Sequence, residues 1–337
     1  MNIVYLIGNG FDLSVGLPTA YSDFYKYYLS QNTEDEEIIK FKKSIETTPD
    51  YWSDLEKALG QYTINLDTEE KINAIHKDLI NNLKTYLKGV EADYDCDDSQ
   101  SVLINQDLIF PEKKLFATDQ QSIDIFKSKW SNVDSWQLKI ITFNYTAILE
   151  KLIGFKTGQE KKIGISKQNR NIFLKEIEHI HGSILKNMAL GLNDISQFSN
   201  ETFHDSRILK NKYIKHELNK VARTGHDEVC QVWIKGANLI CVFGLSFGIT
   251  DLRWWQYIGD RLKGPDVLLI LFYHIKNLNV DELEPAELFE EEVVVKNFFL
   301  NRTSLSDTDK EQVREKIFVS INSSMFKIDN DKFTYKL

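Results

Sequence analysis

His181 is the residue whose type and surroundings point most directly to catalysis. It follows a short predicted strand at residues 177–180 and precedes Gly182, which leaves space for a ligand beside the imidazole ring. Because the pKa of histidine lies near neutrality, this side chain can act as a general base at cellular pH. The alternative is a structural histidine that holds a loop. His179 should lie on the opposite face of the same strand, so we do not expect it to be a partner of His181.

Polar side chains also follow the other predicted strands. Asn144 can orient a water or a ribose hydroxyl, or it can close an Asx turn. Asp12 can contact a ligand or cap a helix, and the same alternatives apply to Thr250 and Asp251. The carboxyl ends of parallel strands share one edge of a sheet, so we expect these side chains to converge on one crevice: Asn9, Asp12, Asn144, His181, Ser246 and Asp251.

A glycine-containing turn follows the first predicted strand, at residues 3–7. Gly8 and Gly10 let the backbone turn sharply and present bare N–H groups, which suit a pyrophosphate. The dinucleotide fingerprint has a third glycine where this sequence has Leu13, and the next glycine is Gly16. The turn thus supports two interpretations equally, a nucleotide site and a turn that only ends the strand. An ordinary NAD dehydrogenase is not expected.

Two other kinds of site receive less support from the residues. No metal site is expected, because His179 and His181 cannot share one face of a strand, and the acidic segment 91–98 lacks the glycine and glutamate of an EF-hand. The segment 244–248 matches the G-x-S-x-G nucleophile elbow, with Ser246 as the nucleophile. Only His274 follows it as a histidine. A serine hydrolase therefore stays the second enzyme hypothesis.

Hydrophobic periodicity predicts the elements that hold these residues. Residues 20–133 have mainly helical patterns, and a capping-box spacing joins Ser53 to Glu56. Residues 210–224 are charged and also helical in pattern. Further strands are predicted at residues 138–143, 177–180, 238–243, 266–272 and 317–321. We predict an α/β fold with a Rossmann-like, doubly wound parallel sheet formed by residues 1–19 and 134–337, and a large helical insertion, residues 20–133, after the first strand.

Composition limits the classes of partner. The chain has 337 residues, 42% of them hydrophobic, and a net charge of −9, which disfavours broad attraction to nucleic acid or anionic membranes. Cys96, Cys230 and Cys241 form no CxxC pair, as is usual in a reducing cytosol. The sequence shows neither a signal peptide nor a long apolar span. We therefore expect a cytoplasmic protein without membrane contact.

Several motifs, each weak by itself, together resemble the AbiH family of bacteriophage abortive-infection proteins over essentially the whole chain. They are Gly8-Asn9-Gly10-Phe11-Asp12-Leu13, Gly16-Leu17-Pro18-Thr19, Trp52-Ser53-Asp54-Leu55-Glu56, Phe143-Asn144-Tyr145-Thr146, His179-Ile180-His181-Gly182 and Phe243-Gly244-Leu245-Ser246-Phe247-Gly248 with Asp251. AbiH proteins in turn resemble the sirtuin (SIR2-like) fold, which binds NAD in a Rossmann-type domain with an inserted helical module.

The sirtuin resemblance assigns roles to individual residues. It implies that His181 is the catalytic base, that Asn144 lies near the nicotinamide ribose, and that the first loop and the segment after residue 243 hold the nucleotide. The implied NAD-binding residues are Gly8, Asn9, Gly10, Phe11, Gly16, Pro18, Gly244, Ser246 and Asp251. Thr146 stands where sirtuins have aspartate, and Asp12 replaces a serine. The four zinc cysteines of the deacylases are absent from the sequence.

The resemblance favours an anti-phage effector that hydrolyses NAD at the nicotinamide–ribose bond. Asp12 would then be the carboxylate that stabilises the developing positive charge. The alternatives are a nucleotide-binding sensor or toxin subunit without hydrolysis, or another hydrolase or nuclease. A resting NAD hydrolase would harm its host, so we also expect inhibition or assembly control, through a homo-oligomer or a regulatory partner.

Overall fold

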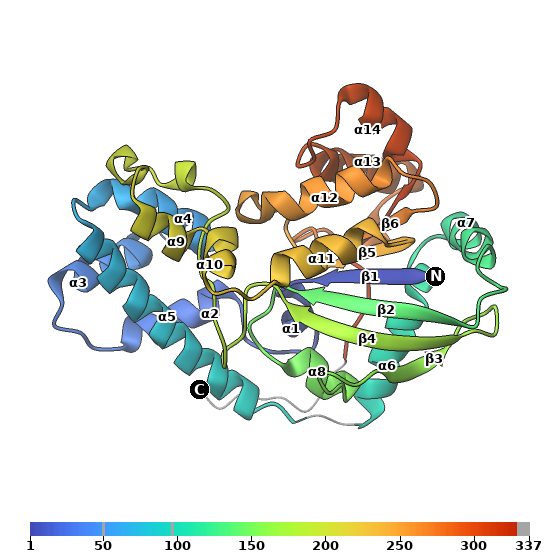
Figure 1. Ribbon diagram of the computed structural model, residues 1–337, viewed down its shortest axis with the longest axis horizontal. Coiled ribbons are helices and arrows are strands. Elements are labelled where there is room, and N and C mark those ends of the chain that lie inside the picture. The colour runs from blue at the N-terminus through green and yellow to red at the C-terminus, as the bar shows by residue number, and fades with distance from the viewer. Residues whose placement is uncertain (49–50, 96–97, 329–337) are drawn as a thin grey trace.

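A seven-stranded sheet with β1 (Asn2–Ile7) at its centre organises the structure (Figure 1). The structure is a computed structural model that describes residues 1–48, 51–95 and 98–328. The strand order is β3-β4-β2-β1-β5-β6-β7. The other strands are β2 (Ser135–Thr142), β3 (Lys161–Ile165), β4 (Asn171–His179), β5 (Leu239–Phe243), β6 (Leu268–Tyr273) and β7 (Ile317–Ile321).

The sheet is parallel except at one edge. β1, β2, β4, β5, β6 and β7 pair in parallel, whereas β3 pairs with β4 in the antiparallel direction. The prediction of a parallel sheet is therefore wrong at this edge. Sequence analysis missed β3, because it is short, includes two lysines and Gly164, and lies at an edge with one neighbour. The fold is a mixed α/β fold with a mostly parallel sheet.

Helices cover both faces of the sheet, which explains why its central strands are apolar throughout. Ile3, Tyr5 and Ile7 of β1 belong to a core on one face, and Val4 and Leu6 belong to the core on the other. The first core takes in α1 (Gly10–Ser14), α6 (Asp98–Ile109), α7 (Ala117–Ser128) and α8 (Ile148–Ile153). The second takes in α11 (His226–Lys235), α12 (Leu252–Leu262), α13 (Pro285–Leu300) and α14 (Asp307–Arg314).

A third core lies beyond the carboxyl ends of the strands, in what we call the helical lobe (Figure 1). Its first helices are α2 (Tyr21–Ser30), α3 (Glu36–Thr47), α4 (Leu55–Tyr62) and α5 (Glu69–Ala92). Residues 184–214 also enter this core, and α9 (Arg207–Tyr213) and α10 (Lys215–Val221) come from the same part of the chain. The lobe thus combines two segments, while α6 and α7 of the predicted insertion pack on the sheet.

The described residues of 20–133 contain helices and no strand, as their periodicity predicts. Across all residues that the structure describes, no helix is long and apolar enough to cross a membrane. Cys230 and Cys241 are buried free thiols, and Cys96 lies outside the described residues.

The loops after β1 and β5 touch each other through backbone atoms. A Cβ atom on Gly10 would lie 2.4 Å from the Cα of Gly244, and Gly244 itself has φ +69°. The N–H of Gly10 donates to the carbonyl of Gly244 at 3.1 Å, and the N–H of Gly8 donates to that of Phe243 at 2.9 Å. These glycines therefore serve the contact between two strand ends.

We expect Gly10→Ala to lower the free energy of unfolding by about 1–3 kcal/mol, because the added methyl group overlaps backbone that has no room to shift. Gly89→Ala is the matched control. Gly89 lies within α5, its added Cβ would meet no atom within 4 Å, and the change should stabilise the helix by about 0.5–1 kcal/mol. Urea titrations of both variants measure the two effects, and equal effects would contradict the steric explanation.

Candidate active site

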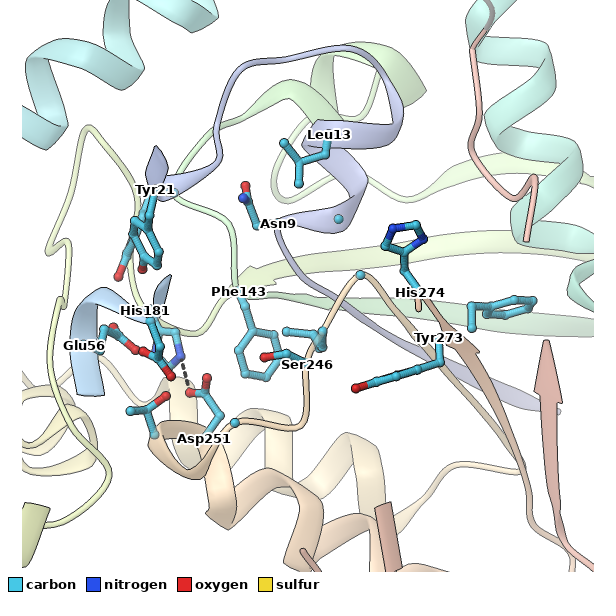
Figure 2. Close-up of a pocket in the computed structure, with 18 of the residues that line it drawn as sticks. Asn9, Leu13, Tyr21, Glu56, Phe143, His181, Ser246, Asp251, Tyr273 and His274 are labelled. Carbon is cyan, nitrogen blue, oxygen red and sulfur yellow. Dashed lines mark hydrogen bonds and ion pairs between the residues drawn. The ribbon is translucent and has the colours of Figure 1, made fainter. Parts of the chain in front are cut away.

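A pocket of about 410 Å³ lies at the carboxyl edge of the sheet, against the helical lobe. From β1 the chain continues to β2 on one side, and the later strand β5 lies on the other side of β1. The pocket lies at this reversal of strand order, which is the usual ligand position in open α/β sheets. Figure 2 shows Glu56, His181 and Asp251 gathered at one end, with Tyr273 and His274 at the other. Its remaining lining residues are Asn9, Gly10, Leu13, Tyr21, Asp54, Phe143, Tyr145, Lys215, Gly244, Leu245, Ser246, Gly248, Thr250 and Phe272.

His181 and Asp251 form a buried pair in this pocket, with the imidazole Nε2 2.9 Å from Oδ1 of Asp251 (Figure 2). A carboxylate only accepts, so Nε2 carries the proton and Nδ1 of the neutral ring holds the lone pair. Nδ1 is buried and has no hydrogen-bond partner among the described residues. Burial and the nearby Lys215 charge lower the pKa of His181, which favours the neutral ring. The arrangement leaves a free basic nitrogen at neutral pH.

The Asp251 side chain turns away from the helix that follows it. The short helix η6 (Ile249–Asp251) leads into α12, and neither Thr250 nor Asp251 forms the predicted side-chain cap. Oδ1 of Asp251 instead accepts from His181 and from Lys215 Nζ, the latter at 3.0 Å. Burial by itself raises the pKa of Asp251, but Lys215 and His181 together hold it below its ordinary range. Asp251 is therefore an anion that orients His181.

Sequence analysis missed Glu56 and Lys215, which complete this cluster. Lys215 Nζ lies 2.6 Å from Oε2 of Glu56, and both side chains are buried. The predicted capping box is wrong, because Asp54 caps α4 and Glu56 points to Lys215. Burial and the neighbouring Asp251 raise the pKa of Glu56, and the Lys215 ammonium opposes this rise by pairing with the carboxylate. Lys215 lies in a charged segment whose composition is typical of a solvent-exposed helix, so nothing in the local sequence indicated that its side chain is buried in a site.

Asp12 and Asn144 meet in a second cavity, of about 100 Å³, beside the first. Oδ1 of Asp12 accepts from Nδ2 of Asn144 at 2.9 Å, and Oδ2 accepts from the Thr146 hydroxyl at 2.6 Å. Oδ1 of Asn144 is buried without a hydrogen-bond partner among the described residues. Burial raises the pKa of Asp12 to about 7, although both hydrogen bonds lower it. The two cavities share Asn9, Tyr21, Phe143 and Tyr145 as walls.

The His179 side chain bonds to Glu150 and to the backbone of Asn144, which lines the second cavity. Its Nδ1 lies 2.8 Å from the backbone carbonyl of Asn144, and its Nε2 lies 2.6 Å from Oε1 of Glu150. Both partners only accept, so both ring nitrogens carry protons and the ring is an imidazolium. Burial lowers the pKa of His179, but Glu150 and the Asn144 carbonyl outweigh it and raise the pKa. The ring holds the backbone of Asn144 in place.

The glycine loop does not offer the bare amides that sequence analysis predicted. The N–H of Gly8 donates to Phe243 at the end of β5, that of Gly10 donates to Gly244 in the loop after β5, and that of Phe11 donates to the Gly8 carbonyl at 2.9 Å. Phe11 is a core residue, and Gly16 is the left-handed residue of a turn, at φ +88°. Gly10, Asn9, Gly244, Ser246 and Asp251 line the main pocket. Gly8, Phe11, Gly16 and Pro18 line neither of the two cavities.

The nucleophile-elbow hypothesis loses its geometric basis. Ser246 and His274 both line the main pocket, yet no hydrogen bond joins Ser246 to a histidine within the described ranges. The helix after β5 begins only at Ile249, whereas the elbow places its serine directly between strand and helix. Across residues 1–48, 51–95 and 98–328, no group of three or more metal-ligating side chains could hold a metal ion.

A family model described as bacteriophage abortive infection AbiH matches residues 4–273. The chain belongs to the AbiH family. The match spans β1 to β6 and every named residue of the two cavities except His274, which directly follows it. Membership in AbiH indicates a function in abortive infection by bacteriophage. Among curated proteins, none matches the sequence.

The raised pKa of Asp12 predicts how the stability of this AbiH protein depends on pH. The folded state keeps the proton up to about pH 7, whereas the ordinary value is 3.8, so Asp12 lowers the stability as pH rises between these values. In Asp12→Asn, Oδ1 can still accept from Asn144 and Nδ2 can donate to the Thr146 hydroxyl, and the side chain no longer ionises, which removes this loss. We expect the stability of the variant relative to wild type to increase by roughly 3 kcal/mol from pH 5 to pH 8.

Urea unfolding at both pH values measures this difference. Asp205→Asn, at an exposed position, is the control and should leave the pH dependence as in wild type. A pH-independent difference between Asp12→Asn and wild type would show that Asp12 ionises in the folded protein as readily as in the unfolded chain.

Proposed function

We propose that this protein hydrolyses NAD at the nicotinamide–ribose bond during phage infection. The observation that carries the proposal is the buried Nδ1 of His181, a basic nitrogen without a partner among the described residues. The carboxylate of Asp251 fixes the tautomer of the His181 ring, because its Oδ1 lies 2.9 Å from Nε2 and accepts the hydrogen bond from that nitrogen. This base lies in a pocket of about 410 Å³ at the carboxyl edge of the sheet, a size suited to a nucleotide.

The order of the strands supports a Rossmann-like, and thus a SIR2-like, interpretation of the fold. Numbered among themselves, β1, β2, β4, β5, β6 and β7 run 3-2-1-4-5-6 across the sheet, the order of dinucleotide-binding folds. The switch in direction falls between β1 and β5, where Gly10 and Gly244 touch and the main pocket opens. The resemblance to sirtuins adds support at the level of the fold.

The residues of the site suit hydrolysis at an anomeric carbon. The oxygen of a water attacks C1′ of the ribose, His181 Nδ1 takes a proton from that water, and the C1′–N bond breaks with its electron pair going to the leaving nicotinamide. The products are ADP-ribose, neutral nicotinamide and a proton. The transition state carries positive charge on the ribose, which an ionised Asp12 stabilises and Asn144 helps to orient. Asp54, Glu56 and Asp251 add acidic groups around the main pocket.

Asp12 and Thr146 exchange the groups that the sirtuin pattern has at their positions. That pattern has a hydroxyl in the first loop and a carboxyl at the position of Thr146. Here the carboxyl is on Asp12 and the hydroxyl on Thr146, and the two side chains share a hydrogen bond of 2.6 Å. The exchange supports the proposal, because a carboxyl group still stands beside Asn144.

The test is the release of free nicotinamide from NAD by purified protein, alone and with lysate of infected cells. His181→Ala removes the base, and we expect it to lower kcat by about 100-fold or more. Asp251→Asn should lower kcat to a smaller extent, because the ring loses its orienting anion. His204→Ala, in the helical lobe, is the control and should retain full activity. A fully active His181→Ala protein would reject the assignment of the base.

Ser246→Ala separates hydrolysis of NAD from serine-hydrolase chemistry. Ser246 lines the pocket and has no hydrogen-bonded histidine among the described residues, so we expect the variant to raise KM several-fold and to leave kcat within about two-fold of wild type. Loss of turnover with unchanged KM would favour a serine nucleophile. Tight binding of NAD without nicotinamide release in the wild-type protein would favour the sensor alternative.

A further inference from the structure

Lys215 is a buried ammonium between two carboxylates that come from different segments of the chain. Its Nζ lies 2.6 Å from Oε2 of Glu56 and 3.0 Å from Oδ1 of Asp251. The side chains of Lys215 and Glu56 are 7% and 9% exposed. Among the described lining residues of the main pocket, Lys215 is the sole lysine or arginine. The proposed reaction assigns no step to it.

Stability alone is a weak explanation for this cluster. Burying an ion pair costs several kcal/mol per ion in desolvation, and apolar residues of similar volume often stabilise a protein as well or better. Lys215 also lies beside the proposed base, since its Nζ and Nε2 of His181 bond to the same oxygen of Asp251. A change at Lys215 therefore reaches His181 through one shared atom.

We propose that Lys215 is a positioning residue for the proposed reaction, which holds Asp251 in place as an anion and keeps His181 neutral with Nδ1 free. The inference rests on the proposed function for its role in catalysis, but its effect on His181 exists without any substrate. Glu56 fixes Lys215 by its second contact, so that one ammonium serves both carboxylates.

The charges around His181 support this role. After burial, the Lys215 ammonium contributes most to the lowered pKa of His181, whereas Asp251 and Asp227 oppose it. Asp227 is itself paired with Arg253, at 3.0 Å. Without Lys215, the two carboxylates would favour a protonated His181, and a protonated ring has no lone pair to accept a proton.

The same contacts join the helical lobe to the catalytic end of the pocket. Glu56 lies on α4, and Lys215 is the first residue of α10. Oε1 of Glu56 also accepts from the N–H of Gly191, at 3.3 Å, so it holds the second segment of the lobe at two points. A displacement of the lobe that moves Lys215 from Asp251 thus changes the protonation of His181. The cluster provides a means by which the lobe controls the base.

The experiment is an NMR titration of the histidine side chains in the full-length protein. The His181 signal is identified by its loss in His181→Gln. Lys215→Met should raise the pKa of His181 by about one unit or more, because a neighbouring positive charge is lost. Lys215→Arg keeps the charge and should restore a value near that of wild type. An unchanged His181 pKa in folded Lys215→Met protein would overturn the proposal, whether or not NAD is hydrolysed.

Lys127→Met is the matched control for loss of a buried ion pair. Lys127 lies 2.5 Å from Oε2 of Glu112, their side chains are 3% and 1% exposed, and neither lines the main pocket. This variant should lose stability and leave the His181 pKa as in wild type. If Lys215→Met does not fold, the double variant Glu56→Gln with Lys215→Gln replaces the ion pair by a neutral pair, and the same rise is expected.

The pH profile of nicotinamide release gives the catalytic readout. In Lys215→Met protein, the acidic limb of kcat/KM should move to higher pH by the same amount as the His181 pKa, with activity partly regained in alkaline buffer. A uniform loss at every pH would indicate a merely structural role and contradict the proposal. If the wild-type protein releases no nicotinamide, the proposed function fails, and the NMR titration still decides the effect of Lys215 on His181.

Discussion

The arrangement of the site depends on one buried ammonium shared by two carboxylates. Lys215 lets Glu56 and Asp251 approach each other out of water, which two unneutralised carboxylates would resist. The contact brings α4, α10 and the segment after β5 to the same point, so it fixes both the helical lobe and the proposed base. A single electrostatic constraint therefore links the global packing of two parts of the chain to the protonation of His181.

The two cavities control the charge of their titratable groups differently. In the main pocket, burial and the Lys215 ammonium favour a neutral His181, while Lys215 and His181 keep Asp251 ionised against its burial. In the smaller cavity, burial raises the pKa of Asp12 to about 7, so its charge changes near neutral pH. Pairs of titratable groups whose environments separate their pKa values are typical of catalytic sites. The protein combines a neutral base with a carboxyl group that is easily protonated, in adjoining spaces that share Phe143 and Tyr145.

Local sequence predicted much of the sheet and the convergence of polar residues at its carboxyl edge, because buried parallel strands have continuous apolar runs and end at one edge. It could not predict which partner each polar side chain finds. Asp251 looks like a helix cap, and Glu56 looks like part of a capping box, yet both bond to Lys215 across more than 30 residues of chain. The glycine turn was predicted to be either a nucleotide site or a simple strand ending, and local sequence did not show that Gly10 and Gly244 bring two loops into backbone contact. Such pairings depend on tertiary packing.

The backbone at the edge of the sheet and the charged side chains around the pocket differ in how freely they can be substituted. The close contact of Gly10 with Gly244 leaves no room for side chains, so the backbone that bounds the pocket is fixed by sterics. The residues that set its charge come instead from the helical lobe and from loops, which are separate from the strands of the sheet. Substitutions there can change the protonation of His181 or Asp12 without disturbing the sheet. The lobe is thus the part of the molecule through which control over the proposed activity can act while the carboxyl edge of the sheet stays intact.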